Sequence, residues 1–178
     1  MHEKIGIAVF DLDGTLIIQD SLYEQIKSML QYSIPNLLRS VFLLIVRGRI
    51  TFKKEVFMIN ENYDSHYLAL NGIKVNENVQ KEFYKYKERD IKVIVATASY
   101  WRTALKVLYK IRLCPDILIS TRNKHNLKGE LKLKYLEPYI KNVRWAYYGD
   151  SNSDVPLFEE ADFPYRVDPY SKKINKLY

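Results

Sequence analysis

The residues with the clearest chemical potential are two aspartates near the N-terminus, Asp11 and Asp13. They follow the apolar segment 5–10, which we predict to be a short buried strand. Side chains at positions i and i+2 of an extended chain project to the same side, and Gly14 permits a sharp turn directly after them. Such a pair can hold a divalent cation and supply a nucleophile and an acid–base group. A solvated Asp-rich turn would give the same pattern, whereas a calcium loop is excluded because Leu22 stands where its bidentate Glu is needed.

A polar position after a second apolar segment offers a place for phosphate. We predict a buried strand over 93–96, and Thr97 follows it directly. The Thr97 hydroxyl, together with backbone N–H groups at the start of the next helix, would suit a phosphate oxygen. The position also suits a helix cap, formed by Thr97 or Ser99, and these residues alone favour the cap.

A second pair of carboxylates, Asp150 and Asp154, follows a strand predicted over 143–148. Four residues apart at the start of a helix, they lie one turn apart on one face. Such oxygen ligands suit magnesium, which keeps part of its water shell. Favourable placement of aspartates at a helix N-terminus explains the pair equally well.

Lysine is a further residue type that binds phosphate, and three lysines compete for this role. Lys132 lies early in a helix predicted over 130–140, with Lys128 and Lys134 close to it. Each of them also fits an ordinary solvated surface lysine.

The elements that must position these residues change in character along the chain. From residue 22 to 60, apolar residues recur at helical spacing, and Pro35 and Gly48 separate three predicted helices. From residue 91 onward, strands alternate with helices, which predicts an α/β fold with a parallel Rossmann-like sheet and helices on both faces. The remaining predictions are a loop over 60–71, helices over 76–88, 100–111 and 155–161, and strands over 116–120 and 163–167.

Composition narrows the class of protein. The 178 residues suffice for one domain with an insert, and 47% hydrophobic residues can form a substantial core. The net charge of +7 suits an anionic partner, but the basic residues are spread along the chain without a nucleic-acid module, so we expect no nucleic-acid binding. A single cysteine, Cys114, and the lack of a signal-peptide pattern lead us to expect a cytoplasmic protein. The apolar stretch 41–46 is too short to span a bilayer.

Taken together and in this order, the motifs resemble those of the haloacid dehalogenase superfamily. Its signature is Asp-x-Asp-Gly-Thr, an apolar strand ending in Thr or Ser, a Lys, and Gly-Asp-x-x-x-Asp, and all four elements occur between residues 7 and 154. The helical insert looks like the type 1 cap of the phosphoserine phosphatase-like branch. The resemblance implies a catalytic core of residues 1–16 and 89–178, with a cap over 17–88.

The resemblance also implies a role for each motif residue. Asp11 is the expected nucleophile, Asp13 the general acid and base, and Thr97 and Lys132 the groups that hold the phosphoryl oxygens. The implied Mg²⁺ is bound by Asp11, the Asp13 carbonyl and Asp150, with Asp154 as a further ligand or support. The residues expected beside the substrate are Gly14, Thr15, Ala98 and Ser99.

A narrower resemblance points to the kind of substrate. The segments 96–99, 126–129 and 148–156 look like the phosphatase-type domain fused ahead of some UbiA-family prenyltransferases. This resemblance and the apolar insert suggest a small or lipid-linked organic phosphate, and also allow a peripheral membrane contact. Packing of the insert's own helices explains its apolar residues more simply. The oligomeric state is left open.

The resemblance favours a Mg²⁺-dependent phosphomonoester hydrolase with an aspartyl-phosphate intermediate. A phosphotransferase or mutase of the same fold would pass the phosphoryl group to another alcohol. A non-catalytic protein that keeps the fold for binding is the alternative from another class, although every motif position is filled.

Overall fold

A six-stranded sheet forms the centre of the computed structural model, which describes residues 5–32, 34–62, 71–122 and 125–178. The strand order is β3-β2-β1-β4-β5-β6, and every neighbouring pair is parallel except β5 and β6. The strands are β1 (Ile7–Phe10), β2 (Lys92–Tyr100), β3 (Ile117–Thr121), β4 (Trp145–Gly149), β5 (Phe163–Val167) and β6 (Ile174–Lys176). The α/β architecture with a mostly parallel sheet confirms the predicted fold class.

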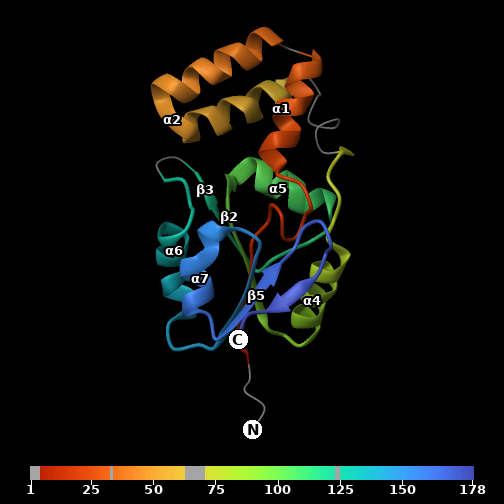
Figure 1. Cartoon of the computed structure of the whole chain (residues 1–178), viewed down its shortest axis with the longest axis vertical. Coiled ribbons are helices and arrows are strands. Elements are labelled where there is room, and N and C mark those ends of the chain that lie inside the picture. The colour runs from red at the N-terminus through yellow and green to blue at the C-terminus, as the bar shows by residue number, and fades with distance from the viewer. Residues whose placement is uncertain (1–4, 33, 63–70, 123–124) are drawn as a thin grey trace.

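Helices connect the strands and cover both faces of the sheet (Figure 1). They are α1 (Ser21–Tyr32), α2 (Ile34–Asn62), α4 (Glu77–Glu88), α5 (Trp101–Lys110), α6 (Glu130–Ile140), the 3-10 turn η1 (Asn152–Asp154) and α7 (Val155–Glu160). Most bounds lie within two residues of those predicted from periodicity. The helix α2 continues to Asn62, so residues 60–62 of the expected loop over 60–71 are helical. Residues 63–70 of that loop lie outside the described residues.

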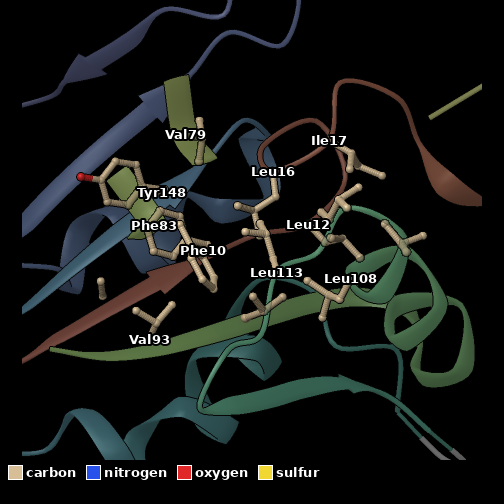
Figure 2. Packing of buried hydrophobic residues seen from close by; sticks show 14 of the residues in the cluster. Phe10, Leu12, Leu16, Ile17, Val79, Phe83, Val93, Leu108, Leu113 and Tyr148 are labelled. Carbon is tan, nitrogen blue, oxygen red and sulfur yellow. The ribbon is translucent and has the colours of Figure 1, made fainter. Parts of the chain in front are cut away.

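The central strand β1 is buried on both faces, and its side chains alternate between two apolar layers. Ala8 and Phe10 pack with α4 and α5, whereas Ile7 and Val9 pack with α6 and α7. Figure 2 shows Phe10 in the first layer, beside Phe83 of α4. A strand that is covered on both faces needs apolar side chains on both, so the sequence 5–10 lacks an alternation of apolar and polar residues.

The helices α1 and α2 form a separate helical lobe, residues 21–62, beyond the carboxyl ends of the strands (Figure 1). Gly48 has φ 78° and ψ 178°, a conformation for which glycine is suited, and it folds α2 back into two arms. The lobe has its own small core, in which Met29 of α1 packs with Phe52 and Val56 of the second arm. Gly48 therefore separates two helical segments, as its position in the pattern predicts.

The helix α4 lies within the range 17–88 expected for the inserted cap, yet it packs on the sheet. Its buried side chains Val79, Phe83 and Tyr86 belong to the same apolar layer as β1 and β2. The helix α4 is therefore part of the apolar layer that covers this face of the sheet.

The carboxyl ends of β1, β2 and β4 meet at one edge of the sheet. Phe10 pairs with Val95 on one side and with Tyr148 on the other, so Asp11 and the residues after Gly149 emerge at the same level. The β2–β3 ladder shifts register between Thr97 and Tyr100, which is the signature of a bulge. Beyond this shift, the Ser99 hydroxyl reaches Asp13, which follows β1.

Candidate active site

Three aspartates from two loops and a short 3-10 turn come together at this edge of the sheet. Asp11 follows β1, Asp150 follows β4, and Asp154 ends η1. One carboxylate oxygen from each lies within 4.8 Å of the others. A set of carboxylate oxygens is the donor type that Mg²⁺ and other hard cations prefer. The cluster can therefore bind a divalent metal ion.

Lys132 supplies the positive charge of the site. Its Nζ lies 3.2 Å from Asp11 Oδ1 and 2.9 Å from Asp154 Oδ1, and it donates a 3.2 Å hydrogen bond to the Tyr147 hydroxyl. The side chain is buried, so the two carboxylates replace the water that a charged ammonium loses. Of the three competing lysines, Lys132 is the one placed against the carboxylates, whereas Lys134 is exposed.

Burial and repulsion between carboxylates raise the pKa values of Asp11 and Asp150. Desolvation, opposed in part by the Lys132 charge, raises the pKa of Asp11 to about 8. Desolvation and the nearby Asp154 carboxylate raise the pKa of Asp150 to about 6. Burial lowers the pKa of Lys132, but Asp11 and Asp154 outweigh this effect and raise it overall. A bound cation would offset this repulsion, so the electrostatics of the cluster fit a metal site.

Two glycines allow the carboxylates to approach so closely. Gly14 has φ 73°, and a Cβ atom built on it would lie 2.2 Å from Asp150 Oδ2. A Cβ on Gly149 would lie 2.8 Å from Asp154 Oδ2. Any side chain at these positions would displace a carboxylate from the cluster.

Asp13 is held by hydrogen bonds from β2 and from the start of α1. The Ser99 hydroxyl donates to Asp13 Oδ2, and the Ser21 backbone N–H donates to Oδ1 at 2.7 Å. Ser21 Oγ also lies 3.1 Å from Ser99 Oγ. Burial and the Asp20 carboxylate raise the pKa of Asp13, although the bonds from Ser99 and Ser21 oppose the shift. A carboxyl group with a raised pKa is suited to donating a proton near neutral pH.

The interpretation of Thr97 or Ser99 as a helix cap is wrong. The strand β2 continues to Tyr100, and Tyr100 is the N-cap residue of α5, without a side-chain cap bond. Thr97 Oγ1 instead accepts a 3.0 Å hydrogen bond from the Ser99 backbone N–H, inside the bulge. Asp154 has the placement expected of an aspartate at a helix N-terminus, because its carboxylate completes a capping box with Ser151. The same carboxylate contacts Lys132.

A cleft of about 510 Å³ opens above these residues, between the sheet and the helical lobe. The lobe contributes Leu22, Leu44 and Phe52 to its wall. From the sheet side, the catalytic candidates Asp11, Asp13, Thr97 and Lys132 and the metal-ligand candidate Asp150 line the cleft. Gly14, Ala98 and Ser99, expected beside the substrate, also line it. Thr15 does not line the cleft, and its side chain is fully buried.

Lys53 connects the helical lobe to the core across this cleft. Its Nζ donates to the Ala98 carbonyl at 2.6 Å and to Asn126 Oδ1 at 2.7 Å. The Thr121 hydroxyl donates to the same carbonyl at 2.8 Å. The bulge in β2 places this carbonyl where the two side chains reach it, and partial burial lowers the pKa of Lys53.

Tyr147 is the site residue that sequence reasoning missed. Its side chain is fully buried, and its hydroxyl accepts from Lys132 beneath the carboxylates. Burial and the Asp11 charge raise its pKa well above the ordinary value, so the hydroxyl stays protonated. A tyrosine in an apolar strand gives no sequence signal for this contact, which depends on the placement of Lys132 of α6 beside Tyr147 of β4.

Comparison with known proteins agrees with this arrangement. A model of the haloacid dehalogenase-like hydrolase family matches residues 8–159, and the chain belongs to this family. The uncharacterized protein y4nM of Sinorhizobium fredii (strain NBRC 101917 / NGR234) is 26% identical over 163 residues. The match covers 86% of this chain but 28% of that protein, so the chain spans less than a third of this relative.

Solved structures share the fold at low sequence identity. A protein with unknown function from Bordetella pertussis Tohama I aligns with a TM-score of 0.67 at 15% identity, covering 92% of this chain and 90% of that one. Phosphoserine phosphatase in its apo form aligns with a TM-score of 0.58 at 18% identity, covering 90% of this chain and 85% of that one. A predicted phosphatase from Clostridium acetobutylicum aligns with a TM-score of 0.57 at 16% identity, covering 85% of this chain and 78% of that one. Among the described residues, no helix is long and apolar enough to cross a membrane.

Proposed function

We propose that the protein is a Mg²⁺-dependent phosphomonoester hydrolase that works through an aspartyl-phosphate on Asp11. The observation that carries this proposal is the contact of Lys132 with Asp11 at the floor of the cleft, within an all-oxygen acidic cluster. Family membership and the phosphatases among the solved structures of the same fold support it.

Asp11 and Asp13 divide the chemistry between them. An Asp11 carboxylate oxygen attacks phosphorus, and the bond from phosphorus to the ester oxygen breaks. Asp13 gives its proton to that leaving oxygen, a step favoured by its raised pKa. Asp13 then takes a proton from water, whose oxygen attacks the aspartyl-phosphate, releasing inorganic phosphate and the free Asp11 carboxylate.

The remaining residues lower the charge barrier to this attack. Mg²⁺, which we propose is held by Asp11, the Asp13 carbonyl and Asp150, supplies charge neutralisation between a carboxylate and a phosphate dianion. Asp154 is a further ligand or, through Lys132, a support for the site. Lys132 and the Thr97 hydroxyl bind the phosphoryl oxygens in the transition state.

For the substrate, we propose a small or lipid-linked organic phosphate bound under a type 1 cap. The apolar side chains Leu22, Leu44 and Phe52 on the lobe side of the cleft support a leaving group with apolar character. The resemblance to the domain fused to UbiA-family prenyltransferases supports the lipid-linked member of this class. We place the cap at residues 17–76, because α4 packs on the sheet. The single cysteine, which is exposed, supports a cytoplasmic location.

Phosphate release from a panel of phosphomonoesters tests the proposal. The panel includes prenyl phosphates and water-soluble sugar phosphates, each with Mg²⁺ or EDTA, and Asp11→Asn serves as the inactive control. We expect Mg²⁺-dependent release that disappears in Asp11→Asn. Phosphoryl transfer to added acceptor alcohols in preference to water would favour the phosphotransferase alternative. Lack of turnover by folded, Mg²⁺-binding protein would favour a binding role.

A further inference from the structure

The first arm of α2, residues 34–47, exposes a row of large apolar side chains. Leu38, Phe42 and Ile45 are 65%, 63% and 79% exposed, at a spacing that keeps them on one side of the helix. Ile34 and Val46 extend the same exposed surface. We call these five residues the outer stripe. In Figure 1 this arm is the orange part of α2, on the side of the helical lobe farthest from the sheet.

Packing within the lobe does not account for the outer stripe. Leu37 and Leu44, on the opposite side of the same arm, already pack against the lobe core, and Ser40 between them is buried. The arm is therefore apolar on both sides, a pattern expected of a helix that is covered all round. A contiguous exposed apolar surface of this kind marks a contact with another surface.

The charge around the outer stripe indicates what covers it. The segment 25–54 contains six basic residues and no Asp or Glu. Arg39 and Arg47 lie on the exposed arm, and Lys54 is exposed on the second arm. The acidic residue Glu55 neutralises one of these charges, since it lies 3.1 Å from Arg39. Arg49 and Lys53 line the cleft, so the cations exposed outside it on α2 are Arg39, Arg47 and Lys54. An apolar stripe on a helix that also carries exposed cations matches the interface of an anionic bilayer, where apolar groups enter the acyl boundary and cations meet the headgroups.

We propose that the outer stripe rests on a membrane surface containing anionic phospholipid, with the first arm of α2 lying in the plane of the interface. A second copy of the chain fits less well, because a two-fold contact would bring the same arginine-bearing surfaces together. The contact goes beyond the proposed function and does not depend on it. It would bring the cleft close to the bilayer, since Leu44 of the same arm lines the cleft wall.

Vesicle co-sedimentation of the whole chain, without substrate, tests the proposal. The probes are vesicles of phosphatidylcholine alone and of phosphatidylcholine mixed with phosphatidylserine. We expect binding to the mixed vesicles that falls with added salt, and about tenfold weaker binding by the double variant Phe42→Ser/Ile45→Ser. The matched control Leu105→Ser/Tyr109→Ser, which removes two exposed apolar side chains from α5, should bind like the unchanged protein.

Three results would overturn the membrane contact: no binding to either vesicle at low salt, equal binding to both vesicles, or unchanged binding by Phe42→Ser/Ile45→Ser. Light scattering that shows a dimer lost in the same variant, with no vesicle binding, would assign the stripe to a second copy instead. Asp11→Asn should bind vesicles fully, so failure of the phosphatase proposal and failure of the membrane contact remain distinguishable. Thermal melts confirm that each variant is folded.

Discussion

Replacing Gly14 by alanine should damage the metal site more than the fold. The added Cβ would stand 2.2 Å from Asp150 Oδ2, whereas such contacts essentially never fall below 3.0 Å. The Asp150 carboxylate is the movable partner, and it must withdraw by about 1 Å, a displacement large enough to impair a catalytic geometry. We therefore expect Asp150 to leave the acidic cluster.

The Gly14→Ala substitution should change two quantities, the folding stability and the Mg²⁺ affinity. The positive φ of 73° should cost about 1–2 kcal/mol of folding stability in Gly14→Ala. Displacing a ligand should weaken Mg²⁺ binding by about 10- to 100-fold, by analogy with the loss of outer contacts that orient metal ligands. A tenfold loss corresponds to about 1.4 kcal/mol of binding free energy.

Gly48→Ala is the matched control. Gly48 has nearly the same φ, 78°, but a Cβ there would have nothing within 4 Å. This variant should lose about 1–3 kcal/mol of stability through backbone strain alone and keep the Mg²⁺ affinity. Comparing the two variants therefore separates strain from displacement of Asp150.

The assay is thermal denaturation over a Mg²⁺ titration, which reports stability in EDTA and metal affinity from the same curves. Gly14→Ala should need about 10- to 100-fold more Mg²⁺ for the same rise in Tm, and Gly48→Ala should need the same amount as the unchanged protein. Equal Mg²⁺ affinities in both variants would refute the role assigned to the Gly14–Asp150 contact.

Three further outcomes follow from the site. Lys132→Met should abolish phosphate release and cost about 3 kcal/mol in denaturant unfolding at pH 7, because it removes the buried cation that contacts Asp11 and Asp154. Lys134→Met, on the exposed side of α6, should change neither quantity. Lys53→Met removes two hydrogen bonds across the cleft and should lower kcat/KM about tenfold, with Lys54→Met as the neutral control. Equal kcat/KM values for the two variants would contradict a role for the Lys53 hydrogen bonds in the reaction. Burial raises the pKa values of Asp11 to about 8 and Asp150 to about 6, so between their ordinary 3.8 and these values the folded state holds protons that the unfolded chain has released. The metal-free protein should therefore lose stability as pH rises from about 4 to 8, and Mg²⁺ should restore more of it at pH 8 than at pH 5; a Tm shift independent of pH would count against this coupling.

Local sequence patterns were sufficient to predict the bounds of most helices and strands. The helix α6 (Glu130–Ile140) and the strand β5 (Phe163–Val167) have the predicted bounds, because periodicity reports which face of an element is buried. The edge strand β6 was not predicted, since its three residues carry no periodic signal. The helix α4 lies within the expected range 17–88 of the insert, and its apolar face packs on the sheet. This long-range contact leaves no signal in the order of elements along the chain.

The candidate site was recognisable mainly through its motifs. Asp11 and Asp150 come together because β1 and β4 are neighbours in register, a long-range pairing that spacing along the chain does not reveal. The bulge that turns Ser99 toward Asp13 is likewise a property of the β2–β3 ladder, so Thr97 and Ser99 read locally as a helix cap. Tyr147 carried no motif at all.

Trapping the phosphorylated protein is the most direct test of an aspartyl-phosphate intermediate on Asp11. Protein would be mixed with Mg²⁺ and a phosphomonoester that it hydrolyses, quenched in acid during turnover, digested and analysed by mass spectrometry. We expect a phosphoryl group on Asp11 that is absent in EDTA and absent from Asp11→Asn, a variant that should also release no phosphate. Rapid phosphate release by Asp11→Asn, or a phosphoryl group found on another residue, would contradict it.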